Sequence, residues 1–208
     1  IDRAADAGIP VITTDSDIDG SRRTCCVSID SAKASRIAGR LLGQFLNGQG
    51  KIAIISSAIE TENNNYYVRM REQGFTDFIR REYPEIEIVS CIESFEDPQI
   101  TYRKTTELLK EQPELRGLYI TCGGVAQVGR ALIESGRADS IRVLCYEDYP
   151  EIVELIRQGV VDWTLGGEKA AQGSLPVKLI MDQLVFGRKP ATDRIFTDTR
   201  ILIKECFE

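Results

Sequence analysis

Six short apolar runs along this chain end on polar residues or glycine, and each leads into a segment with helical spacing. The runs begin at Ile12, Ala53, Ile88, Leu118, Val143 and Trp163. Strands that alternate with helices in this way predict a parallel α/β sheet. In such sheets ligands bind beyond the carboxyl ends of the strands, so the residues that close these runs are the first candidates for a site.

The bulk composition is that of a globular chain. With 208 residues, of which 42% are hydrophobic, it can form one large domain or two small ones. The net charge of −6 argues against a nucleic-acid contact made by this segment, because such contacts need clustered Lys and Arg. No apolar stretch approaches the ~20 residues that span a bilayer, and the first residues do not resemble a signal peptide. We therefore expect no membrane segment, although Ile1 leaves open whether residues precede it.

The cysteines and the missing histidines limit the chemistry further. Six cysteines show no CxxC spacing, and four lie in or at the end of predicted strands, so we expect free thiols in a reducing, cytoplasmic setting. The chain contains no histidine, which removes Ser-His-Asp triads, HExxH zinc sites and imidazole bases. We expect no enzyme, metal or cofactor; the enzyme alternative would use Asp15 and Glu147 as an acid and base pair.

Helix boundary signals fix several elements. The clearest helix runs from Asp30, a predicted N-cap, to a stop at Gly48. Asp97 followed by Pro98 predicts another helix start. Strands are expected at 10–14, 25–29, 51–57, 87–93, 118–121, 141–146, 160–165 and 200–204, and a long helix at 170–186.

Several stretches resemble one known family. They are AGIPVITTDSD from Ala7, the block from Asp30 to Ile55, RMREQGF from Arg69, SFED from Ser94, GLYITCGGVAQVGRALIESG from Gly117, IRVLCYEDYPE from Ile141 and LIRQGVVDWTLGGEKAAQG from Leu155. Together they are similar to the effector domains of LacI-type transcription regulators and to the related ribose-type sugar-binding proteins. The resemblance implies a type I periplasmic-binding-protein-like fold, in which two doubly wound parallel-sheet lobes enclose a ligand in the cleft between them.

The resemblance also divides the chain. Residues 1–29 would be a partial first lobe, 30–166 the second lobe, 167–194 a return to the first lobe, and 195–208 the final strand of the second. The opening strands of the first lobe have no counterpart here. Because one strand and one helix cannot cover their own apolar faces, we expect upstream residues or a partner chain to cover them.

Four side chains are predicted to contact a ligand. The resemblance makes Asp15 an acceptor for two sugar hydroxyls, although a D-S-D loop also favours Asp as a turn residue. Arg69, six residues before Phe75, would reach ligand hydroxyls from the second lobe; otherwise it is a solvated arginine. Phe95 would stack on a sugar ring, unless it packs in the core under its loop. Glu147 stands where the family usually has Asp.

Two further residues stay open beside these. Asp148 competes with Glu147 for the cleft-facing position. Trp163 could line the cleft, but a core position is favoured.

Three departures from the family change the walls of the predicted site. Gly123, followed by Gly124, replaces Asn-Asp; Gly167 replaces Gln; and Ser16 replaces Arg. These changes predict a roomier pocket or backbone N–H groups that favour an anionic ligand. The alternative, which we favour, is that the two adjacent glycines only form a tight turn.

The resemblance implies a regulator's effector-binding domain. A sugar or sugar-derived effector would change how a homodimer presents separate helix-turn-helix headpieces, outside this chain, to DNA. No bond would be made or broken. The alternative is an exported sugar-binding protein that serves a transporter or sensor.

Overall fold

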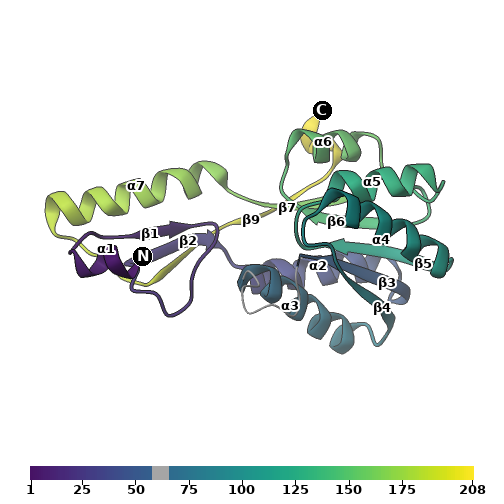
Figure 1. Ribbon diagram of the computed structural model, residues 1–208, viewed down its shortest axis with the longest axis horizontal. Helices are drawn as coiled ribbons and strands as arrows, with labels where there is room; N and C mark the ends of the chain where they lie inside the picture. Colours follow the sequence, from purple (N-terminus) through teal and green to yellow (C-terminus); the bar gives the residue numbers. More distant parts are fainter. Residues whose placement is uncertain (58–65) are drawn as a thin grey trace. The chain divides into compact units, whose positions relative to one another are not determined.

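The computed structural model describes residues 1–57 and 66–208, which divide into two compact units. Among the described residues, the first unit comprises 1–31, 66–67 and 167–200, and the second comprises 32–57, 68–166 and 201–208. Figure 1 shows the elements of both units. Each unit is described by itself below.

The second unit is built on a six-stranded sheet. Its strands are β3 (Gln49–Ser56), β4 (Glu85–Glu93), β5 (Leu115–Ile120), β6 (Arg142–Tyr146), β7 (Trp163–Gly167) and β9 (Thr199–Leu202), in the order β4-β3-β5-β6-β7-β9. The pairs among the first five are parallel. The helices are α2 (Ser31–Phe45), α3 (Tyr66–Glu82), α4 (Pro98–Glu111), α5 (Val125–Glu134) and α6 (Pro150–Arg157), with a 3₁₀ helix at Lys204–Phe207. The predicted parallel α/β fold is therefore confirmed.

Helices cover this sheet on both faces. Successive side chains of a strand point to opposite faces. Ile120 of β5 packs in one core cluster with Leu108 of α4 and Leu132 of α5, whereas its neighbour Tyr119 stacks on Phe75 of α3, 4.2 Å between ring centroids. Strands that are apolar on both faces explain why their sequences read as continuous apolar runs.

The strand order contains one topological switch point. The chain passes from β3 to β4 on one side and then to β5 on the other side of β3. In open parallel sheets, the carboxyl ends of the two strands at such a switch point are where ligands bind.

The predicted helix start at Asp97 and the helix stop at Gly48 are confirmed, and the N-cap role of Asp30 stays a prediction. The Asp97 side chain accepts a hydrogen bond of 2.8 Å from the backbone N–H of Ile100, with Pro98 in the first turn of α4. At the end of α2, Asn47 and Gly48 adopt left-handed φ values of 51° and 76°.

The first unit is smaller. Its parallel sheet has the order β1 (Ile12–Thr14), β2 (Cys25–Ile29), β8 (Arg194–Thr197), and the helices are α1 (Asp2–Asp6) and α7 (Lys169–Phe186). The central strand β2 is buried along its whole length, whereas α7 packs on β1 and β2 without burying any residue completely.

The predicted boundary at residue 195 is wrong. Residues 195–200 belong to the first unit, not to the second lobe, because β8 pairs in register with β2, with Ile195 opposite Val27 and Thr197 opposite Ile29. The chain enters the sheet of the second unit only with β9, which lies next to β7. None of the described helices is long and apolar enough to cross a lipid bilayer.

Candidate functional site

The switch point of the second unit is closed by buried hydroxyl groups. Thr121, directly after β5, donates its backbone N–H to Ile55 O at 2.9 Å. Its Oγ1 lies 3.1 Å from Ser56 Oγ at the end of β3. These contacts fix the ends of the two strands, so a ligand at this edge would meet a rigid floor.

Arg71 of α3 lies against the same strand ends. It donates from Nη1 to Thr121 O at 3.1 Å, and its guanidinium lies 3.8 Å from the ring centroid of Tyr146 at the end of β6. The Tyr146 and Tyr119 hydroxyls are 2.7 Å apart, and burial raises the pKa of both phenols, so both stay neutral. Arg71 thus ties α3 to the ends of β5 and β6.

Sequence reasoning selected Arg69 and missed Arg71. Arg69 is exposed, and residues two apart in a helix do not share a face. The signal for Arg71 was present, because it lies four residues before the fully buried Phe75 and so on the same face of α3. The ligand role of Arg69 stays a prediction.

The connection after β4 presents an aromatic ring. Phe95 is 50% exposed with φ 53°, so the alternative that it packs in the core is wrong. Ser94 shapes this turn, because its Oγ donates to Ser56 O at 2.9 Å and accepts from the N–H of Glu96 at 3.2 Å. The ring is accessible to a ligand, and its stacking role stays a prediction.

The two glycines after β5 stand in different surroundings, and only one of them is required by the backbone. Gly124 has φ 93°, and a Cβ there would lie 2.9 Å from Thr101 Cγ2, so the tight turn itself requires glycine. At Gly123 a Cβ would lie 3.4 Å from Glu96 Oε2. A carboxylate beside Gly123 disfavours a bound anion at this point, contrary to one of our expectations.

Glu147 is held in place by β7. Its backbone N–H donates to Leu165 O at 2.9 Å, and its carbonyl accepts from Thr164 Oγ1 at 2.5 Å. Its φ is 71°. Both Glu147 and Asp148 are half-buried, so exposure does not choose between them.

Left-handed backbone is concentrated at the predicted site residues. Among the described residues, the non-glycine residues with positive φ are Asp15, Asn47, Phe95, Glu96 and Glu147. Three of the five are predicted ligand residues. Such conformations cost of order 1–3 kcal/mol each and persist where the surroundings enforce them, often at binding sites.

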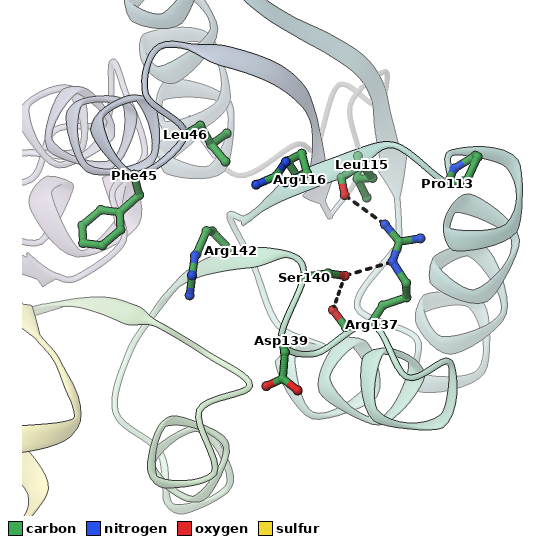
Figure 2. Close-up of a pocket in the computed structure, with 9 residues that line it drawn as sticks. All are labelled: Phe45, Leu46, Pro113, Leu115, Arg116, Arg137, Asp139, Ser140 and Arg142. Carbon is green, nitrogen blue, oxygen red and sulfur yellow. Dashed lines mark hydrogen bonds between the residues drawn. The ribbon is translucent and has the colours of Figure 1, made fainter.

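The hollow drawn in Figure 2 lies elsewhere. It has a volume of about 330 Å³ and is lined by residues at the amino-terminal ends of β5 and β6, and none of the predicted ligand residues lines it. The candidate site is therefore defined by strand ends and backbone geometry.

In the first unit, Asp15 follows β1. Its backbone N–H donates to Val27 O at 3.0 Å, its φ is 62°, and its side chain is exposed. Ser16, also exposed, donates its N–H to Thr14 O at 2.7 Å. Both predicted residues thus stand at the carboxyl edge of the small sheet, free to meet a ligand.

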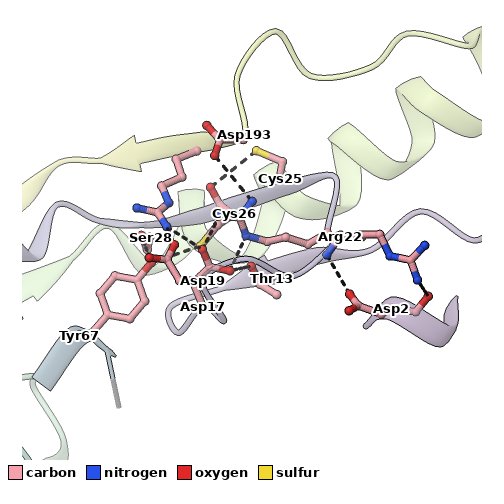
Figure 3. A network of polar contacts seen from close by, with 12 residues as sticks. Asp2, Thr13, Asp17, Asp19, Arg22, Cys25, Cys26, Ser28, Tyr67 and Asp193 are labelled. Atoms are coloured by element: carbon pink, nitrogen blue, oxygen red, sulfur yellow. Dashed lines mark hydrogen bonds and ion pairs between the residues drawn. The ribbon is translucent and has the colours of Figure 1, made fainter. Parts of the chain in front are cut away.

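A buried ion pair holds the loop that carries Asp15 and Ser16 (Figure 3). Both carboxylate oxygens of Asp17 accept from the Arg23 guanidinium, and one also accepts from Thr13 Oγ1 at 2.9 Å. The side chains of Asp17 and Arg23 are 0% and 6% exposed. Burial alone would raise the pKa of Asp17, but the hydrogen bonds from Arg23 and Thr13 and the Arg23 charge outweigh it, so the pKa is lowered.

The same loop contains the sequence DSDIDG, from Asp15 to Gly20. Aspartates at alternate positions before a glycine are typical of calcium-binding loops. Here the Asp17 carboxylate is already paired with the Arg23 guanidinium, so it is not available to bind a cation. In the described part of the chain, no three Asp, Glu, Cys or His side chains gather as metal ligands would.

Gly167 does not enlarge a pocket as predicted. A Cβ there would lie 2.8 Å from Ile29 Cγ2 and 2.5 Å from Gln172 Nε2. The space beside Gly167 is filled by these side chains, so glycine serves their close packing.

Comparison with known proteins gives a consistent result. The family model described as periplasmic binding protein domain matches residues 1–189. GanP, a glucose-galactose binding protein from Geobacillus stearothermophilus, is 26% identical with a TM-score of 0.88; the match covers 100% of this chain and 72% of that one. No curated protein matches the chain.

Two further solved structures share the fold. A solute-binding protein of an ABC transporter from Burkholderia graminis, in complex with D-arabinose, is 24% identical with a TM-score of 0.89, over 98% of this chain and 70% of that one. A sugar-binding protein of a sugar ABC transporter from Bacillus halodurans is 23% identical with a TM-score of 0.89, over 99% and 72%. By the extent of the family match and by its fold, the chain belongs to the periplasmic binding protein domain family.

Proposed function

We propose that the protein binds a carbohydrate and presents it to a transporter or a sensor. The observation that carries this proposal is the edge of the second unit's sheet at its switch point. There Phe95, Glu96 and Glu147 are held in left-handed backbone conformations. The family membership and the sugar-binding proteins named above support it.

The chemistry of this edge suits neutral polyhydroxylated molecules. Carboxylates and backbone carbonyls accept from sugar hydroxyls, and an exposed aromatic ring such as Phe95 can stack on the CH face of a sugar. The acidic groups disfavour phosphorylated sugars. We extend the proposal to Asp15 and Ser16 of the first unit, and the cleft between the lobes stays a prediction.

The transporter or sensor role is favoured over the regulator role by the named structures. One is a solute-binding protein of an ABC transporter, and another belongs to a sugar ABC transporter. We propose binding without catalysis, so a bound sugar should be released unchanged.

A second candidate is the effector domain of a LacI-type regulator. One observation favours it: all six cysteines are free thiols, which suits a reducing, cytoplasmic setting. In that case the protein would act as a homodimer, and DNA would be bound by a segment outside this chain.

A ligand screen tests the binding proposal. We expect thermal stabilisation by at least one of a panel of pentoses, hexoses and inositols, and weaker or no stabilisation by their phosphates. Titration calorimetry then gives the affinity, and NMR of the recovered sugar shows whether it was converted. Stabilisation by no neutral sugar, or turnover of one, contradicts the proposal.

Matched variants test the site. Asp15→Ala and Glu147→Gln should each weaken the best ligand by roughly ten- to a hundredfold, the value of a charge-assisted hydrogen bond. Asp139→Asn, an exposed acidic residue at the other end of the sheet, is the control and should have no effect. Unchanged affinity in both site variants contradicts the assignment.

The two roles separate by location and partner. In its natural host, a solute-binding protein should fractionate outside the cytoplasmic membrane, whereas a regulator should remain in the cytoplasm and bind an operator in a ligand-dependent way.

A further inference from the structure

The hollow in Figure 2, here called the arginine hollow, lies within the second unit at the amino-terminal end of its sheet. The end of α2, the start of β5, the connection from α5 to β6 and the start of β6 surround it. It is therefore at the opposite end of β5 and β6 from the residues proposed to bind carbohydrate.

Its lining is basic in an acidic protein. Arg116, Arg137 and Arg142 line it against one acid, Asp139, an excess of two positive charges, although the whole chain carries −6. Gly117 of β5 pairs with Arg142 of β6, so Arg116 and Arg142 lie on neighbouring strands one residue apart in register. Side chains at successive register positions leave the sheet on opposite faces, and both arginines reach the hollow because they stand at the starts of their strands.

The charges of two of these arginines are not neutralised by carboxylates. In the part of the chain that the structure describes, neither Arg116 nor Arg137 forms an ion pair, whereas Arg142 pairs with Asp162 at 2.8 Å. Arg137 bonds to uncharged oxygens, Ser140 Oγ at 3.1 Å and Leu115 O at 3.0 Å. A third, longer bond runs to Leu109 O at 3.5 Å, so the guanidinium is fixed in place without a carboxylate partner among the described residues, an arrangement that can bind an anion without further ordering.

The remaining wall is apolar. Phe45 is 54% exposed and packs edge-on against Trp163, 4.2 Å between ring centroids, and Leu46, Pro113 and Leu115 complete the lining. An inorganic anion would leave this surface uncovered, whereas an anion with an aromatic or apolar body would cover it.

We propose that the arginine hollow is a second binding site, for a small organic anion that carries a carboxylate or a phosphate group on an aromatic or apolar body. This site is independent of the carbohydrate site. The guanidinium groups hold the anionic group, and Phe45 contacts the body.

Phenyl phosphate and benzoate are suitable probes, with inorganic phosphate and phenol as partial ones. Trp163 is the only tryptophan and touches Phe45, so its fluorescence reports binding in this hollow. We expect saturable fluorescence changes with phenyl phosphate or benzoate, weaker binding of inorganic phosphate and of phenol, and an affinity that falls with added salt. The stronger of the two full probes identifies the anionic group.

Variants localise the effect. Arg116→Gln should weaken the better probe about tenfold, and Arg116→Gln with Arg142→Gln should weaken it further, while carbohydrate affinity stays unchanged. Arg103→Gln, an exposed arginine of α4 paired with Glu107, is the control and should have no effect. No saturable binding of either full probe, or equal affinity in the double variant, overturns the proposal.

Discussion

The two units of this protein are stabilised in different ways. The second unit buries apolar side chains on both faces of a parallel sheet, and Leu118, Leu132 and Val143 are all inaccessible to solvent. In the first unit, α7 buries no residue fully, and Leu184 and Phe186 are 64% and 62% exposed. Within this chain, apolar burial on both sheet faces forms the core of the second unit, whereas the first unit combines one fully buried strand with a group of polar contacts.

Those polar contacts gather beside β2. The Asp17 carboxylate bonds to Arg23 and lies 3.5 Å from Arg194 at the start of β8, and the Tyr67 hydroxyl lies 3.3 Å from Ser28 Oγ (Figure 3). They connect the loop after β1 to the two other strands of the small sheet.

The largest expected effect is on the free energy of unfolding, and it is measured by comparing two leucine substitutions. Leu132→Ala, in the core of the second unit, should lower the free energy of unfolding by about 4 kcal/mol, because it leaves a cavity. Leu184→Ala on α7 should change it by less than about 0.5 kcal/mol. Denaturant unfolding of both variants measures the difference. A similar loss in both would remove the distinction between the units.

The next largest effect is the loss of stability when the polar contacts of the first unit are broken. Asp17→Asn leaves the buried guanidinium of Arg23 with only the longer ion pair to Asp193, at 4.0 Å, and should destabilise this unit by about 3 kcal/mol. Glu107→Gln, in the exposed Arg103 pair, is the matched control and should have little effect. Hydrogen exchange at β2 amides localises the loss.

The same pair predicts a pH dependence. The pKa of Asp17 is lowered in the folded protein from its ordinary value of 3.8. The stabilisation is therefore complete above this value and is lost as the pH falls below it through the folded pKa. Unfolding between pH 2 and 6 should show this loss in the natural chain and not in Asp17→Asn. Identical pH profiles would contradict the role of the pair.

A smaller effect concerns backbone strain. Glu147→Gly removes a left-handed residue that strains the backbone and should raise stability by about 1 kcal/mol, whereas Asn47→Gly should change it little because Asn adopts this conformation readily. Only Glu147→Gly should also weaken carbohydrate binding, because Asn47 lies at the end of α2. Equal effects of the two variants on binding would contradict the assignment of Glu147 to the carbohydrate site.

The last effect is on a reaction rate and leaves stability unchanged. Burial raises the pKa of the Cys122 thiol to about 11, so at pH 8 its thiolate fraction is roughly a hundredfold below that of an ordinary cysteine. Alkylation of Cys122 should be slower than that of the exposed Cys206, and a bound carbohydrate should slow it further. Mass spectrometry of the labelled peptides measures both rates.

Much of the fold was predictable because burial on both faces leaves continuous apolar runs in the sequence. The boundary at residue 195 was not, because the pairing of β8 with β2 joins residues more than 160 positions apart and leaves no local signal. Trp163 was expected in the core and is 5% exposed. Arg71 and the Asp17–Arg23 pair were not predicted. The family resemblance identifies residues that contact a ligand, whereas these residues hold the strand ends and the loop that carry such contacts.

Three described connections at the carboxyl edge of the large sheet are short. Four residues join β4 to α4 (94–97), four join β5 to α5 (121–124) and three join β6 to α6 (147–149). Each begins and ends in a packed element, so none has the length to rearrange alone. Divergence among descendants of this chain would then change ligand preference by exchanging single side chains on a fixed frame, and an engineer could do the same without rebuilding any loop.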